Sequence, residues 1–200
     1  MEIVKGKKLP KQFCYGGNYG RKLSLDKFFQ LEKDKKLKAG DWSVQYIHSL
    51  DYQYNDGGRE KAGYKGFTGD CVVRAISIVT GLSYQKVYDD LYNQTREWRL
   101  ASNSRHAKAA KPEGDSPRTG VYKDVYKPYL EKLGYKWIPT MFVGQGCKVH
   151  LRKNELPMGK LIVSVSKHIT TVIDGVLNDT YDCSRNGERC VYGYFMKEGK

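Results

Sequence analysis

The stretch Gly69-Asp70-Cys71-Val72-Val73-Arg74-Ala75-Ile76 decides the fold, because a chain-breaking glycine, a cysteine and an apolar helical repeat follow one another within it. Apolar residues recur with the i, i+3, i+4, i+7 spacing of one helix face at Val72, Ala75, Ile76 and Val79. Gly81 stands where a glycine commonly ends a helix. Cys71 is therefore expected in the first turn of a buried helix, where the helix dipole lowers the pKa of a thiol and favours the reactive thiolate.

Two more helices are expected downstream of this one. Ser83 is a suitable N-cap for the second helix, and Thr119 for a third that reaches Leu133 and is interrupted at Pro128. The segment 103–119 mixes proline, glycine, serine and charge, so it is expected to be a surface loop that is mobile unless bound.

Strand patterns dominate the remainder of the chain. One or two short strands are expected within residues 42–54, and five more at 137–143, 160–165, 168–173, 176–181 and 190–195. Helices followed by a run of strands indicate an α+β domain, with the helices segregated from an antiparallel sheet. Residues 1–40 are expected to form a basic arm with a short helix capped by Ser24, and residues 41–200 the main domain.

Asp174-Gly175 predicts a tight hairpin between two of these strands. If Ile173 pairs with Val176, His168 and Asp179 lie on one face as diagonal neighbours, with Cα atoms roughly 7–8 Å apart. An aspartate so placed can fix the tautomer of a histidine and leave its other nitrogen for a thiol. A bulge would instead bring Asn178 or Asp182 to that position.

A cysteine that opens a core helix, followed by a histidine and an aspartate on consecutive C-terminal strands, resembles the papain-like cysteine peptidase superfamily. The nearest resemblance is to small uncharacterised papain-like proteins of bacteria and tailed phages, through 69–75 and through His168-Ile169-Thr170-Thr171-Val172-Ile173-Asp174-Gly175-Val176. It covers about residues 55–195. The resemblance implies a papain-like fold with Cys71 as nucleophile, His168 as general base and acid, and Asp179 as orienter, but no particular substrate.

The family's oxyanion-hole glutamine, six residues before the cysteine, is replaced by Lys65. The Cys71 amide is a candidate for one oxyanion donor. Lys65, Thr68, or Gln53 and Asn55 are candidates for the other. Loss of one such donor typically costs about 10²–10³ in rate, so a slow or inactive relative is an alternative to an efficient enzyme.

The five cysteines are odd in number and irregularly spaced, which favours reduced thiols, a cytoplasmic location and no disulfide framework. A zinc site built from Cys147, His150, Cys183 and Cys190 is disfavoured, because paired cysteines at both ends are the usual pattern. We expect no metal and no cofactor. No apolar run approaches the roughly 20 residues of a membrane span, and no secretory signal is expected at the N-terminus.

The net charge of +13, concentrated in the first forty residues and in 99–111, has two interpretations. One is contact with nucleic acid or an acidic protein, and the other is solubility alone. The preferred function is a thiol hydrolase that cleaves a peptide or isopeptide bond in a peptide or protein substrate. The alternatives are a basic binding protein on the same scaffold, such as a phage-borne inhibitor of a host factor, and a structural protein in which Cys71 is merely buried.

Overall fold

The computed structural model describes residues 12–16, 21–24, 30, 42–46, 49–66 and 68–197, and the chain divides into the units Met1–Ser49 and Leu50–Lys200. The first unit contains a three-stranded antiparallel sheet in the order β2-β1-β3. Its strands are β1 (Gln12–Gly16), β2 (Arg21–Ser24) and β3 (Trp42–Tyr46). The short helix expected after Ser24 lies, apart from Gln30, outside the described residues.

The second unit is a mixed α+β domain built on a six-stranded sheet in the order β4-β8-β7-β6-β9-β5. The strands are β4 (Asp51–Tyr54), β5 (Tyr135–Pro139), β6 (Lys160–Val165), β7 (His168–Ile173), β8 (Val176–Asp179) and β9 (Val191–Lys197). The expectation of a wholly antiparallel sheet is wrong at one edge, because β4 pairs in parallel with β8. Strand β4 precedes the helices in the chain, so no hairpin joins it to β8.

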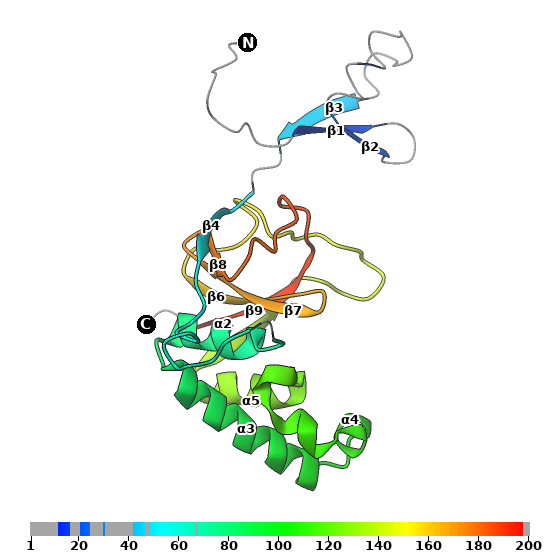
Figure 1. Ribbon diagram of the computed structural model, residues 1–200. Helices are drawn as coiled ribbons and strands as arrows, with labels where there is room; N and C mark the ends of the chain where they lie inside the picture. Colours follow the sequence, from blue (N-terminus) through cyan, green and yellow to red (C-terminus); the bar gives the residue numbers. More distant parts are fainter. Residues whose placement is uncertain are drawn as a thin grey trace. The chain divides into compact units, whose positions relative to one another are not determined.

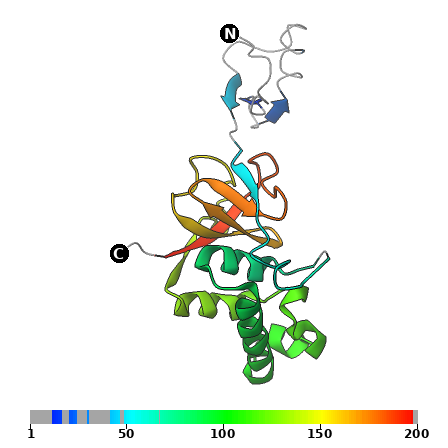
Figure 2. The ribbon, with the colours of Figure 1, turned by 60° about the vertical axis from the view of Figure 1, so that its left-hand side comes forward.

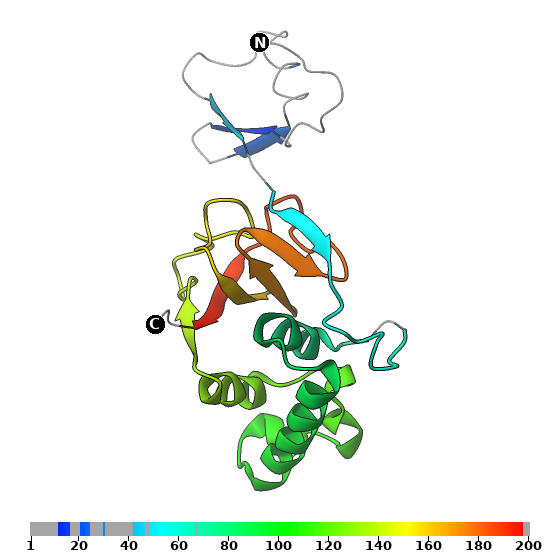
Figure 3. The ribbon, with the colours of Figure 1, turned by 90° about the vertical axis from the view of Figure 1, so that its left-hand side faces the viewer.

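Helix α2 (Cys71–Thr80) packs against the sheet at β7, and α3 (Tyr84–Ala101) packs on the other side of α2 (Figure 1). Helix α5 (Lys123–Lys132) packs against α3 and against the edge strand β5. Turned views show the same order of sheet, α2 and α3 (Figures 2 and 3). Ser83 caps α3 as predicted, accepting a hydrogen bond from the Lys86 amide at 3.3 Å. The predicted cap at Thr119 is wrong, because α5 begins only after Tyr122.

The segment 103–119 is not a loop without regular structure. It contains α4 (Arg105–Ala109) and two short 3-10 helices, Pro112–Asp115 and Pro117–Thr119. A guanidinium–carboxylate pair between Arg99 and Asp115, with two hydrogen bonds of 2.7 Å, ties it to α3. The composition of the segment did not predict these contacts, which fix it beside α3.

Two apolar clusters stabilise the domain on opposite faces of the sheet. Neighbouring residues of β6 alternate between them, since Ile162 packs into the cluster around α2 while Leu161 and Val163 pack into the other. The apolar cluster around α2 fills that face of the sheet. The polar groups at the N-terminal end of α2 lie at the edge of this cluster.

A disulfide joins Cys147 to Cys190, with a sequence separation of 43 residues. The expectation that the chain carries only reduced thiols is therefore wrong for this pair. The sequence did not predict this bond, because Cys147 lies in a loop, Cys190 lies just before β9, and no local pattern links the two. Cys71 and Cys183 are free. Within the described part of the chain, no helix combines the length and apolar character that crossing a membrane requires.

Candidate active site

A pocket of about 750 Å³ opens at the N-terminal end of α2, and Cys71 stands in its wall. The segment 119–121, the start of α5 and the turn between β6 and β7 complete its walls. Gly69 lets the wall segment approach, because its amide donates to the Arg118 carbonyl at 2.8 Å and an added Cβ would lie only 3.2 Å from that oxygen. Close packing against this segment therefore explains why a glycine stands at position 69, two residues before Cys71.

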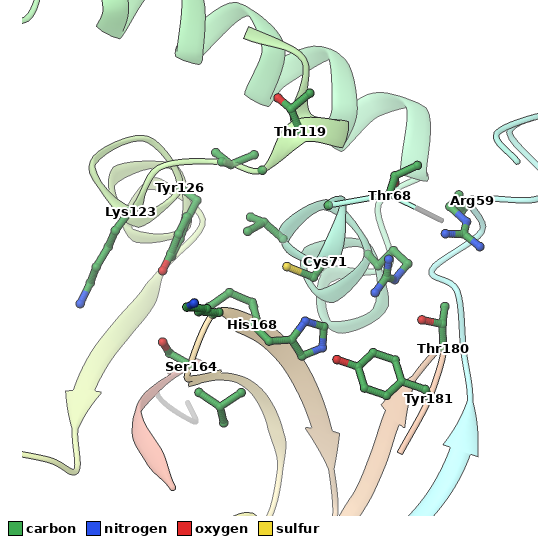
Figure 4. A pocket seen from close by; sticks show the side chains of 18 of the residues that line it. Arg59, Thr68, Cys71, Thr119, Lys123, Tyr126, Ser164, His168, Thr180 and Tyr181 are labelled. Carbon is green, nitrogen blue, oxygen red and sulfur yellow. The ribbon is translucent and has the colours of Figure 1, made fainter. Parts of the chain in front are cut away.

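The thiol of Cys71 and the imidazole of His168 face one another in this pocket (Figure 4). Burial alone would raise the pKa of the Cys71 thiol, but the hydrogen bond and charge of His168 outweigh it. The Ile169 amide and the Arg74 charge act in the same direction. The net result is a lowered pKa of Cys71, so the pocket favours the thiolate.

His168 is bonded on its other side to Asp179, with 2.7 Å between Nε2 and Oδ2. A carboxylate can only accept, so Nε2 carries the hydrogen and Nδ1 is left for Cys71. Burial would lower the pKa of His168, but its hydrogen bonds to Asp179, Cys183 and Cys71 favour the protonated ring and raise it. Burial would likewise raise the pKa of Asp179, yet its bond to His168 lowers it. The pair is therefore imidazolium and carboxylate.

The predicted hairpin register is confirmed, since Ile173 pairs with Val176 and Val172 with Leu177. The two alternative partners of the histidine have other contacts. Asn178 accepts a hydrogen bond from Asn55, and Asp182 accepts one from the Ser184 amide. Asp179 is the carboxylate that reaches His168.

A buried ionic network below Asp179 was not found from the sequence. The second carboxylate oxygen of Asp179 accepts a hydrogen bond from Arg74 at 3.2 Å, and Arg74 also pairs with Asp70. Asp70 is fully buried and accepts a further hydrogen bond from the Tyr84 hydroxyl at 2.8 Å. The available signal was Asp70 and Arg74 themselves, an i, i+4 charge pair at the start of an apolar helix.

The four candidate oxyanion residues lie in different places. Thr68 lines the pocket, and its buried hydroxyl has no hydrogen-bond partner within the described part. Lys65 and Gln53 are exposed, and neither they nor Asn55 belong to the pocket wall. The Cys71 amide is the first of its helix and so has no acceptor within it.

Three side chains could hold a metal ion, because ligand atoms of His168, Asp179 and Cys183 lie within 4.8 Å of one another. The fit is poor. Nε2 of His168 already donates to Asp179, and the Arg74 guanidinium lies against the same carboxylate. A bound metal ion would have to displace the hydrogen bond between His168 and Asp179, and it would lie close to the positive charge of Arg74. Of the zinc set considered from the sequence, Cys147 and Cys190 form the disulfide.

In comparison with known proteins, the chain matches no family model, no curated protein and no solved structure. The fold and the site together define an α+β domain that brings a thiol, an imidazole and a carboxylate into line. The arrangement of these three side chains is the basis of the function proposed below.

Proposed function

We propose that this protein is a cysteine-nucleophile hydrolase of papain-like fold that cleaves a peptide or isopeptide bond. The observation that carries the proposal is the line of Cys71, His168 and Asp179 at the mouth of a pocket. A thiol with a lowered pKa, a base that faces it in the same pocket and a group that orients the base are the three parts of an activated nucleophile. The resemblance of the sequence to papain-like peptidases assigns the same three residues.

In the first half of the reaction, the Cys71 thiolate attacks the carbonyl carbon and forms a C–S bond, and the carbonyl π electrons move to oxygen. The tetrahedral intermediate collapses, the C–N bond breaks, and the His168 imidazolium gives its proton to the leaving nitrogen. An acyl thioester on Cys71 remains. Asp179 holds the ring in the tautomer that faces the sulfur.

In the second half, neutral His168 takes a proton from water, which attacks the thioester carbon. The C–S bond breaks and returns the thiolate, and the carboxylic acid product leaves. The Cys71 amide and Thr68 are the candidate donors to the oxygen that becomes negative in both halves. With Lys65 in place of the usual glutamine, Thr68 is the candidate that lines the pocket.

The proposal is tested by incubating the full chain with a complex peptide library and identifying new termini by mass spectrometry. The parent is expected to generate products and a thioester trapped on Cys71 after acid quench. Cys71→Ala is expected to give neither, while retaining the parent's melting temperature. Products formed equally by Cys71→Ala would overturn the proposal.

A second candidate is a basic binding protein that uses the fold without catalysis, favoured by the net charge of +13 and by Lys65 at the glutamine position. It predicts salt-sensitive binding to nucleic acid or to an acidic protein that Cys71→Ala leaves unchanged. Turnover that is lost in Cys71→Ala separates the two candidates.

A further inference from the structure

The walls of the Cys71 pocket carry cations and no carboxylate. Among the described residues that line it are the basic side chains Arg59, Arg74, Lys123 and Lys167, and none is aspartate or glutamate. The adjacent acidic residues Asp124 and Asp182 are not part of the lining. A concave site with one sign of charge concentrates ligands of the opposite sign.

Buried carboxylates neutralise only part of this charge. Asp70 and Asp179 lie behind the wall, where both contact Arg74 and Asp70 also lies 3.8 Å from Arg59. These two anions balance the two arginines, and the Cys71–His168 ion pair balances itself. The charges of Lys123 and Lys167 are left facing the pocket.

The backbone and a neighbouring ring hold these two lysines in place. Lys123 is the first residue of α5, and its ammonium lies 4.1 Å from the centre of the Trp137 ring. Lys167 occupies the turn before His168 with a φ of 55°, which directs the chain abruptly into β7. Both are exposed, and no ion pair involving either one is formed within the described residues.

The two unbalanced lysines share the pocket with the nucleophile, and Lys123 stands on one side of Cys71 (Figure 4). A peptide that presents its carbonyl to Cys71 would therefore meet uncompensated positive charge close to the scissile bond. A neutral chain would gain nothing from these side chains, whereas an acidic chain gains ion pairs with Lys123 and Lys167.

We infer that the substrate is an acidic peptide segment, with anionic side chains close to the bond that Cys71 attacks. The inference rests on the proposed hydrolase function and adds its specificity. Glutamate and aspartate are the side chains that fit two ammonium groups on the pocket rim. A phosphoserine offers the same anionic chemistry and is distinguished in the test.

Binding is measured with full-length Cys71→Ala, so that the readout does not depend on turnover. Fluorescent degenerate peptides with a fixed Glu-Glu pair are compared with Gln-Gln and phosphoserine counterparts by anisotropy at low salt. The Glu-Glu set is expected to bind roughly tenfold tighter than Gln-Gln, and the preference should weaken as salt rises. Tighter binding of the phosphoserine set alone would assign phosphate instead of carboxylate and overturn the choice of glutamate and aspartate.

The added substitutions Lys123→Gln and Lys167→Gln are each expected to weaken Glu-Glu binding about twofold to fivefold, without changing Gln-Gln binding. Lys108→Gln and Lys132→Gln, on exposed helical surface outside the pocket wall, are matched controls expected to have no effect. Equal affinity for both peptide sets, or an undiminished preference in the Lys123/Lys167 double variant, would overturn the inference. Displacement of peptide by a far lower concentration of single-stranded RNA would do so too. None of these results bears on whether Cys71 is a nucleophile.

Discussion

Arg74 donates a hydrogen bond of 3.2 Å to Oδ1 of Asp179, the carboxylate whose other oxygen holds the ring of His168. The same guanidinium pairs with the fully buried Asp70. One arginine on α2 thus connects the proposed nucleophile's helix to the strand that bears the orienting carboxylate. Its removal would leave the fully buried Asp70 without its nearest cation and Asp179 with His168 as its remaining cationic partner.

Replacement of Arg74 by alanine is expected to lower the free energy of unfolding by about 3–5 kcal/mol, because a buried charge without its partner is costly. Urea denaturation followed by circular dichroism measures this. The double variant Asp70→Asn/Arg74→Met removes charge from both ends of one pair and should lose markedly less. A loss below about 1 kcal/mol for Arg74→Ala would contradict the role assigned to this residue.

Asp179→Asn tests the orientation of His168. An asparagine keeps the shape but can present its amide to Nε2, which reverses the tautomer and turns a ring N–H toward the thiol. Turnover of any substrate is expected to fall by about 10²–10⁴ while the fold is retained. The rate of alkylation of Cys71 near neutral pH should fall as well, and Asp182→Asn serves as the matched control. Equal rates in both variants would contradict the arrangement.

The Asp179–His168 pair also predicts how stability depends on pH. The pKa of Asp179 is lowered below its ordinary 3.8, so its contribution is present above that pH and lost as pH falls through the folded-state pKa. The pKa of His168 is raised above its ordinary 6.5, so its contribution is complete below 6.5 and lost only as pH rises through the raised value.

The difference in unfolding free energy between the parent and Asp179→Asn should therefore be largest between these two ordinary values. It should shrink as the solution becomes strongly acidic. Denaturant titrations at a series of pH values measure the difference. A gap that stays constant into strong acid would show that the carboxylate is not ionised in the folded protein.

The Cys147–Cys190 disulfide is expected to contribute about 2–4 kcal/mol, since it closes a loop of 43 residues in the unfolded chain. Thermal melts with and without a reductant measure this contribution. Cys147→Ser should melt like the reduced parent and should no longer respond to the reductant. A parent that melts identically under both conditions would contradict a formed bond.

The site was predictable where local patterns determine it. Helical periodicity placed Cys71 at the start of α2, and the Asp174-Gly175 turn fixed the register that sets His168 beside Asp179. Both follow from interactions between neighbours in sequence or across one hairpin. The β4–β8 pairing depends on strands more than a hundred residues apart, and no local pattern encodes it.

Contacts of the same long-range kind account for the other differences. The segment 103–119 is held in its helical turns by the pair of Arg99 with Asp115 and by packing against Gly69. Its composition does not reveal these contacts and therefore suggested a loop. The bond of Arg74 to Asp179 spans 105 positions in the chain, so no local pattern indicates that the network continues beyond the Asp70–Arg74 pair. Polar networks between distant elements are what single-sequence reasoning reaches least.

The most direct measurement is the pH dependence of alkylation of Cys71, followed by mass spectrometry on the intact fold, with buried Cys183 as an internal comparison. A thiolate–imidazolium pair predicts rapid modification of Cys71 already at about pH 6, well below the ordinary range of a thiol, and loss of that acid-side reactivity in His168→Gln. If Cys71 instead gains reactivity only above about pH 8, identically in the parent and in His168→Gln, the thiolate–imidazolium pair does not exist and the proposed hydrolase has no nucleophile.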